Sequence, residues 1–195
     1  MFVKICGMTS TDAVDAALAA GVDALGFVFA ESPREVTAEQ ALSLSDAVPG
    51  DVVRVAVMHH PSAALVAHVL GVFEPDWLQT DAEDFEAMSL PADCAAVPVF
   101  RNGHVPMHDD QPPRLLFEGA ISGSGKVADW NEARVLAQRT ELILAGGLDA
   151  HNVVDAIEQV KPWGVDVSSG VEREPGRKDA GKIREFVARV RTVEK

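Results

Sequence analysis

The sequence is poor in basic side chains and contains no long apolar run. Its 17 lysines and arginines stand against 30 acidic residues, which gives a net charge of −13 over 195 residues. Nucleic-acid affinity rests largely on clustered Lys and Arg, so a nucleic-acid partner is not expected. No apolar segment is long enough to cross a bilayer, and the first residues carry no secretory signal pattern. We therefore expect no membrane partner and a cytoplasmic location.

Cysteine is also scarce. Cys6 and Cys94 allow one disulfide arithmetically, but without a secretory signal both thiols are expected to be reduced. They form no C-x-x-C pair, and His59 and His60 have no convincing Cys/His ligand spacing around them. The sequence therefore predicts no structural zinc. It favours a solvated loop for the two histidines and a core or loop-edge position for Cys94.

Hydrophobic residues make up 47% of the chain and charged residues 24%, which is ordinary for a globular protein with a substantial core. Short β-branched runs alternate with Ala/Leu-rich segments, a pattern typical of βα units around a parallel sheet. The expected strands are 2–6, 23–29, 52–58, 76–79, 95–100, 114–118, 141–145 and 164–168. The expected helices are 10–21, 37–47, 61–71, 130–139, 150–160 and 180–190.

Eight strands favour a compact (β/α)8 TIM barrel formed by a single domain over residues 1–195. Its fifth helical unit is expected to be shortened or irregular, because "RNGHVPMHDDQPP" resembles a loop more than a helix. An open doubly wound sheet is the alternative, since periodicity does not establish closure.

Residues typical of helix ends agree with this division of the chain. Ser10 or Thr11 can cap the first helix, Thr37 with Gln40 makes a capping-box pattern, and Asp129 is expected to cap the helix at 130–139. Glycines 21 and 71 are suited to helix ends.

In such a barrel the carboxyl ends of the strands surround the catalytic mouth. Cys6 follows the first strand, and Gly7 permits a sharp turn after it, so a thiol placed there could exchange a proton. Lys4 could position the thiol or an anion, or form a structural ion pair. Arg34 could present its planar fork to a carboxylate or form an ordinary ion pair.

Three other strand ends also carry candidates. Glu118 could act as a general acid, although a carboxylate at a strand end needs no catalytic explanation. Asp166 could accept hydrogen bonds from sugar hydroxyls or from neighbouring backbone N–H groups. The glycine-containing loops after the seventh and eighth strands could hold a phosphate through backbone N–H groups; they carry Gly146, Gly147, Ser169 and Gly170.

Five segments in order resemble the phosphoribosylanthranilate isomerase family: "KICGMT", "GFVFAESPR", "SGSGKVADW", "LAGGLDAHNV" and "GVDVSSGVEREPGRKD". The resemblance implies an Amadori rearrangement of N-(5-phosphoribosyl)anthranilate in tryptophan biosynthesis, without a metal or organic cofactor. Cys6 would be the general base and Glu118 the general acid. Arg34 would contact the anthranilate carboxylate and Asp166 the ribose hydroxyls. The backbone of the two loops would bind the phosphate.

Two departures from the family pattern bear on these roles. The family commonly has an aspartate acid within an "LLD"-like pattern, whereas this chain reads "RLLFEGA", so that a direct register would put Phe117 at the aspartate position. Asp81 lies in "LQTDAED", where relatives often read like "LQLHG", and cannot take the role of the histidine. The alternatives are a related phosphosugar isomerase and a noncatalytic phosphosugar-binding barrel. The substrate is expected to be a small phosphosugar and the chain a monomer or homodimer.

Overall fold

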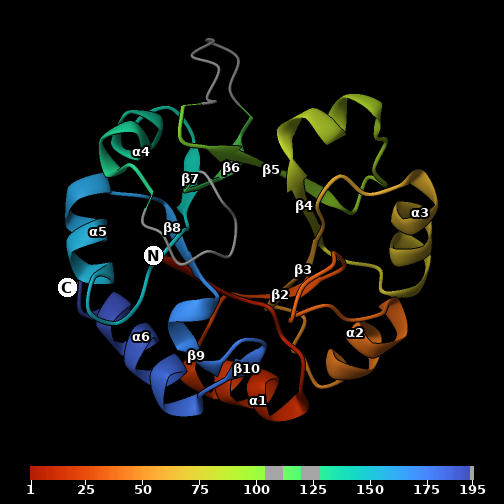
Figure 1. Cartoon of the computed structure of the whole chain (residues 1–195), viewed down its shortest axis with the longest axis horizontal. Helices are drawn as coiled ribbons and strands as arrows, with labels where there is room; N and C mark the ends of the chain where they lie inside the picture. The colour runs from red at the N-terminus through yellow and green to blue at the C-terminus, as the bar shows by residue number, and fades with distance from the viewer. Residues whose placement is uncertain (104–111, 120–127, 194–195) are drawn as a thin grey trace.

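The computed structural model of the chain describes residues 1–103, 112–119 and 128–193 (Figure 1). Eight parallel strands form a closed barrel in sequence order. They are β1 Phe2–Cys6, β2 Ala24–Val28, β3 Val53–Val57, β4 Trp77–Asp81, β5 Ala95–Arg101, β6 Arg114–Glu118, β7 Glu141–Leu144 and β8 Gly164–Val167. Parallel pairing of β8 with β1 closes the barrel, with Phe2 opposite Gly164. The predicted (β/α)8 barrel is confirmed, and the open sheet is excluded.

Helices surround the barrel (Figure 1). The α-helices are α1 Thr11–Ala20, α2 Ala38–Leu44, α3 Ala63–Val72, α4 Trp130–Leu136, α5 Val153–Val160 and α6 Ala180–Thr192. Two 3₁₀ helices, η1 Ala82–Ala87 and η2 Ser169–Val171, follow β4 and β8, and β9 Glu172–Glu174 pairs with β10 Arg177–Lys178. Most of the loop predicted in the fifth unit, residues 104–111, lies outside the described residues. So does 122–127, which holds most of the motif "SGSGKVADW".

The helix boundaries follow the capping chemistry of the sequence. Ser10 caps α1, the Thr37–Gln40 capping box is present, and Asp129 accepts hydrogen bonds from the first turn of α4. These predictions are confirmed. The prediction that Gly71 ends a helix is wrong, because Gly71 lies inside α3, which continues to Val72.

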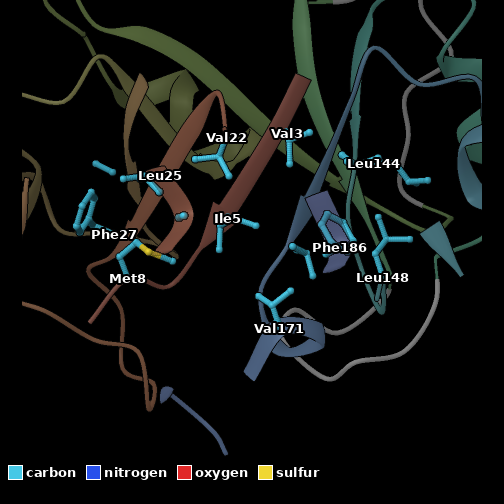
Figure 2. Packing of buried hydrophobic residues seen from close by; sticks show 14 of the residues in the cluster. Val3, Ile5, Met8, Val22, Leu25, Phe27, Leu144, Leu148, Val171 and Phe186 are labelled. Carbon is cyan, nitrogen blue, oxygen red and sulfur yellow. The ribbon is translucent and has the colours of Figure 1, made fainter. Parts of the chain in front are cut away.

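Side chains along each strand alternate between two cores. Val3 and Ile5 of β1 point outward and belong to the large cluster between barrel and helices, which also contains Phe186 of α6 (Figure 2). The barrel interior holds a smaller cluster, made of Val97, Val99, Leu116, Ile143 and Ala145. Burying each large apolar side chain contributes roughly 1.5–3 kcal/mol. The inner layer fills the barrel, so it is a packed core and not a pore.

An aromatic group closes the amino-terminal end of the barrel. Phe2 stacks on Trp77 and Trp163, with ring centroids 5.2 and 4.6 Å apart. The Arg114 guanidinium lies 4.2 and 4.4 Å from the two indole centroids, within the range of cation–π attraction. A ligand therefore has to approach from the carboxyl ends of the strands. Among the described residues no helix is both long enough and apolar enough to span a membrane.

Candidate active site

Cys6 is the last residue of β1, and Lys4 and Asp166 lie beside it. Lys4 Nζ donates a hydrogen bond to Asp166 Oδ1 over 2.9 Å, and the two residues lie opposite each other on β1 and β8. All three side chains are buried. Gly26 on β2 leaves them room, because a Cβ at that position would lie 3.0 Å from Cys6 Sγ and 3.2 Å from Lys4 Cε.

Burial and charge oppose each other at this site. Burial lowers the pKa of Lys4, but the negative charge of Asp166 and side-chain hydrogen bonds to Asp166 and Cys6 outweigh that effect, so the pKa is raised and the ammonium stays charged. Burial raises the pKa of the Cys6 thiol, and Asp166 adds to this effect. The cations Lys4, Lys178 and Arg34 only partly offset the rise. At neutral pH the site therefore favours the thiol, and the thiolate is the minority form.

Arg34 and Lys178 share one carboxylate next to this group. Arg34 donates through Nε and Nη2 to the two oxygens of Glu172, over 2.8 and 2.9 Å, and Lys178 Nζ donates to Glu172 Oε1 over 2.8 Å. Lys178 also bonds the carbonyl and hydroxyl oxygens of Ser168, whose hydroxyl in turn donates to the Cys6 carbonyl. The close approach of Arg34 needs Gly7, which has φ +84° and whose Cβ would lie 2.6 Å from Arg34 Cδ.

The two glycine-containing loops after β7 and β8 lie against each other. Gly146 and Gly147 adopt left-handed backbone conformations, with φ of 83° and 65°. A Cβ on Gly170 would lie 2.0 Å from the Leu148 carbonyl oxygen, so only glycine lets the loops approach this closely. Ser169 begins η2 in the second loop. The backbone of both loops thus lies at the carboxyl ends of adjacent strands.

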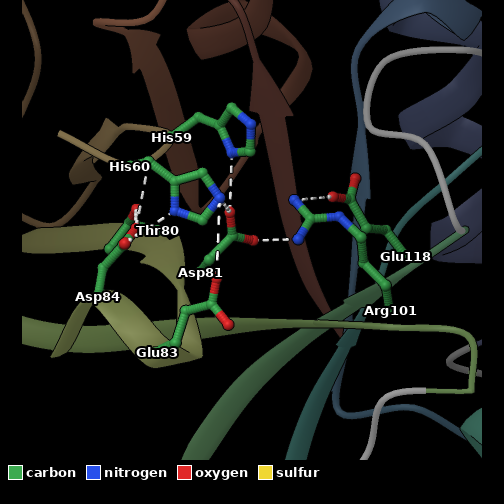
Figure 3. A network of polar contacts seen from close by, with 8 residues as sticks. All are labelled: His59, His60, Thr80, Asp81, Glu83, Asp84, Arg101 and Glu118. Carbon is green, nitrogen blue, oxygen red and sulfur yellow. Dashed lines mark hydrogen bonds and ion pairs between the residues drawn. The ribbon is translucent and has the colours of Figure 1, made fainter. Parts of the chain in front are cut away.

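A second group of charged side chains occupies the ends of the next strands along the rim (Figure 3). Arg101, the last residue of β5, pairs with Asp81 Oδ1 at the end of β4 and, over 3.1 Å, with Glu118 Oε1 at the end of β6. Asp81 Oδ2 also contacts His59 Nδ1 over 2.7 Å. One guanidinium therefore links the two carboxylates, and both carboxylate side chains are largely buried.

The alternation of β6 decides which residue of "RLLFE" reaches the mouth. Phe117 is fully buried in the outer cluster beneath the helices, whereas Leu116 belongs to the inner cluster. Glu118, two residues after Leu116, lies on the inward side. Phe117 therefore faces away from the mouth, although a direct register would put it at the position of the family's aspartate.

The structure gathers the predicted residues into two groups on one rim. Lys4, Cys6 and Asp166 lie together with Arg34 nearby, whereas Glu118 belongs to the group around Arg101. The predicted site did not include Glu172, Lys178 or Arg101. Lys178 stands in the charged run "REPGRKD", which looks solvated, yet only 1% of its side chain is exposed.

Comparisons with known proteins agree with this geometry. The sequence profile described as N-(5'phosphoribosyl)anthranilate (PRA) isomerase matches residues 3–189. The chain belongs to this isomerase family. It is 41% identical over 192 residues to the N-(5'-phosphoribosyl)anthranilate isomerase of Streptococcus pneumoniae (strain Hungary19A-6), covering 97% of this chain and 95% of the relative.

Solved structures of the family superpose over almost the whole chain. The phosphoribosyl anthranilate isomerase of Thermus thermophilus is 31% identical, with a TM-score of 0.86 and coverage of 99% and 100% of the two chains. A phosphoribosyl anthranilate isomerase in complex with reduced 1-(o-carboxyphenylamino)-1-deoxyribulose 5-phosphate has a TM-score of 0.80 at 26% identity, with 98% and 99% coverage. The family predicted from the five motifs is thus confirmed.

Proposed function

We propose that this chain isomerises N-(5'-phosphoribosyl)anthranilate to the corresponding 1-deoxyribulose 5-phosphate, the tryptophan-biosynthetic reaction of its family, with Cys6 and Glu118 as base and acid. The observation that carries the residue assignment is the buried group of Cys6, Lys4 and Asp166 at the end of β1. The thiol lies beside the Lys4–Asp166 ion pair, and the cations Lys178 and Arg34 are also close enough to act on its pKa. It is suited to take up and return one proton.

In the proposed mechanism Glu118 protonates the furanose ring oxygen, and the C1–O bond breaks to open the ring as an iminium ion. Cys6 thiolate then removes the proton from C2. The C2–H electron pair forms the C1–C2 double bond of an enolamine, which tautomerises to the ketone. A general acid must carry a proton, whereas an arginine partner favours the ionised carboxylate. The acid role therefore requires Glu118 to become protonated despite its ion pair with Arg101.

The same rim supplies donors for both anionic ends of the substrate. The backbone of Gly146, Gly147, Ser169 and Gly170 would bind the phosphate, and Asp166 the ribose hydroxyls. Arg34 engages Glu172 through Nε and Nη2, so Nη1 is the nitrogen that would meet the anthranilate carboxylate. The proposal also includes one barrel domain over residues 1–195, a cytoplasmic location, no nucleic-acid partner and a monomer or homodimer.

Loss of substrate fluorescence tests the activity, with spontaneous decay subtracted. Cys6→Ala and Glu118→Gln should each lower kcat by about 10²- to 10⁴-fold, the usual contribution of a positioned acid or base. Cys94→Ala and Glu174→Gln are matched controls, since Cys94 is buried away from the mouth and Glu174 is half exposed in a surface pair with Arg177. Both controls should keep full turnover.

Each contrary result has a distinct meaning. Full turnover in Glu118→Gln would move the acid to another side chain, and full turnover in Cys6→Ala would overturn the base assignment. If the unaltered, folded chain binds the product but does not turn over the substrate, the barrel is a noncatalytic phosphosugar-binding protein.

A further inference from the structure

Two histidines converge on one buried carboxylate, Asp81, within the rim group that also contains Arg101 and Glu118. His59 and His60 follow β3, and Asp81 ends β4 (Figure 3). His59 Nδ1 lies 2.7 Å and His60 Nε2 lies 3.4 Å from Asp81 Oδ2. The three ligand-type atoms all lie within 4.8 Å of one another. Both imidazole side chains are about half exposed, whereas Asp81 is 6% exposed.

The backbone at His60 makes this convergence geometrically feasible. Consecutive side chains of an extended chain point to opposite sides, so neighbouring residues do not ordinarily reach the same atom. His60 adopts φ +44°, a left-handed conformation that is uncommon for a residue with a side chain. The two rings thereby lie on the same side, with centroids 4.3 Å apart, and both reach Asp81 Oδ2.

An outer carboxylate orients the second ring. His60 Nδ1 lies 2.9 Å from Asp84 Oδ1, and Asp84 is itself held by the Thr80 hydroxyl and by the His60 backbone N–H. When Nδ1 donates its proton to Asp84, Nε2, which lies 3.4 Å from Asp81 Oδ2, keeps the lone pair that a metal ion would use. Metal-ligating histidines characteristically donate their other ring N–H to a carboxylate in this way.

We propose that His59, His60 and Asp81 bind one divalent first-row transition-metal ion of the Zn²⁺ or Co²⁺ kind. Two imidazoles and one carboxylate form a donor set that binds these ions in preference to Mg²⁺ or Ca²⁺. Ligand bonds of about 2.0–2.2 Å place neighbouring tetrahedral ligands roughly 3.4 Å apart. The His60–Asp81 separation is already 3.4 Å, and the His59–Asp81 separation has to open by less than an ångström.

The surrounding charges permit a cation here. Arg101 takes the Oδ1 atom of Asp81, so the guanidinium and the ion would use different oxygens of the carboxylate. Glu83 and Asp84 add two carboxylates on the other side, with Glu83 Oε1 3.8 Å from His60 Nε2. Glu83 is therefore a candidate fourth ligand. The sequence predicts no structural zinc, because no Cys/His ligand spacing surrounds the two histidines. The third ligand, Asp81, stands 21 residues after His60 on the next strand.

The test uses the untagged full chain, freed of metal by dialysis against a chelator and titrated with Zn²⁺ by calorimetry and with Co²⁺ by visible absorption. We expect one ion per chain with nitrogen and oxygen ligation. His60→Gln and Asp81→Asn should each weaken binding by more than about 100-fold, and Asp84→Asn by about 10- to 100-fold, the usual cost of removing an orienting partner.

His68→Gln is the matched control, because His68 is an equally exposed histidine that contacts Glu39 from α3. It should leave the affinity unchanged. If Asp81→Asn disturbs the fold by releasing Arg101, His59→Gln replaces it in the comparison. The proposal is overturned if no saturable 1:1 binding occurs, if His60→Gln binds as tightly as the unaltered chain, or if the Co²⁺ spectrum shows thiolate ligation from Cys6 or Cys94. It does not depend on isomerase activity.

Discussion

Replacing Lys4 by methionine should destabilise the barrel far more than replacing an exposed cation. Lys4 Nζ lies 2.9 Å from Asp166 Oδ1, and the side chains are 1% and 9% exposed. Methionine keeps most of the aliphatic length of lysine but removes the ammonium group. The Lys4→Met variant therefore leaves the Asp166 carboxylate buried without its ion-pair partner.

The magnitude follows from two opposing terms. At 2.9 Å and an effective dielectric constant of about 20, the attraction between the charges is about 6 kcal/mol. Burying each ion costs several kcal/mol, so the intact pair contributes little net stability, while removing one partner costs about 3–5 kcal/mol. The double variant Lys4→Met/Asp166→Asn removes both charges. It should lie within about 2 kcal/mol of the unaltered chain.

Urea unfolding followed by tryptophan fluorescence at neutral pH gives the free energies of unfolding. Arg177→Met is the matched control, because Arg177 pairs with Glu174 in a largely exposed ion pair that should contribute at most about 1 kcal/mol. The reasoning is refuted if Lys4→Met costs no more than Arg177→Met. It is also refuted if the two single-variant costs simply add in the double variant.

Three further predictions follow from the rim and the core. Burial raises the pKa of Cys6, so the residual kcat/KM of Glu118→Gln, in which the acid no longer titrates, should rise from about pH 7 to about pH 9, and adding Lys178→Gln should move this rise to higher pH; a flat profile in Glu118→Gln would contradict the base assignment. Gly170→Ala pushes a Cβ against the Leu148 carbonyl, so inorganic phosphate should inhibit that variant at least about tenfold more weakly. Burial raises the pKa of Cys94 from 9.0 to about 11, so its contribution to stability is present below pH 9 and lost as pH rises toward 11. In urea unfolding, the free energy of unfolding of Cys94→Ala should therefore decline less steeply over that pH range than that of the unaltered chain.

Local pattern predicted the strands and helices because each element has its own apolar periodicity and its own caps. β1 and β6 coincide with the expected ranges, and the other strands differ by at most two residues at either end. Closure is different, since it depends on β8 pairing with β1 across the whole chain. The prediction that Gly71 ends a helix is wrong because α3 continues past it to Val72. The left-handed residue just after the helix is a non-glycine, Glu74, with φ 49°.

The candidate site was less predictable, because its charges find partners on distant elements. The sequence shows that Arg34 is suited to bind a carboxylate, but not that Glu172, 138 residues later, already occupies one edge of its guanidinium. The burial of Lys178 and its pairing with Glu172 could not be predicted either, since a lysine in a charged run gives no local sign of burial. The inward position of Glu118 could have been read from the two-residue period, because the inward Leu116 precedes it and the outward Phe117 lies between them.

The division of charge around the rim explains how a chain of net charge −13 could hold an anionic substrate. At the ends of β8, β1 and β2, three cations form ion pairs with two carboxylates, which leaves a local net charge of +1. The cations are Lys4, Arg34 and Lys178, and the carboxylates are Asp166 and Glu172. Charges more than about 8 Å away are largely screened at physiological salt. The potential that a phosphosugar meets there is set by this local excess and by backbone N–H groups. The remaining acidic residues of the surface affect it only weakly.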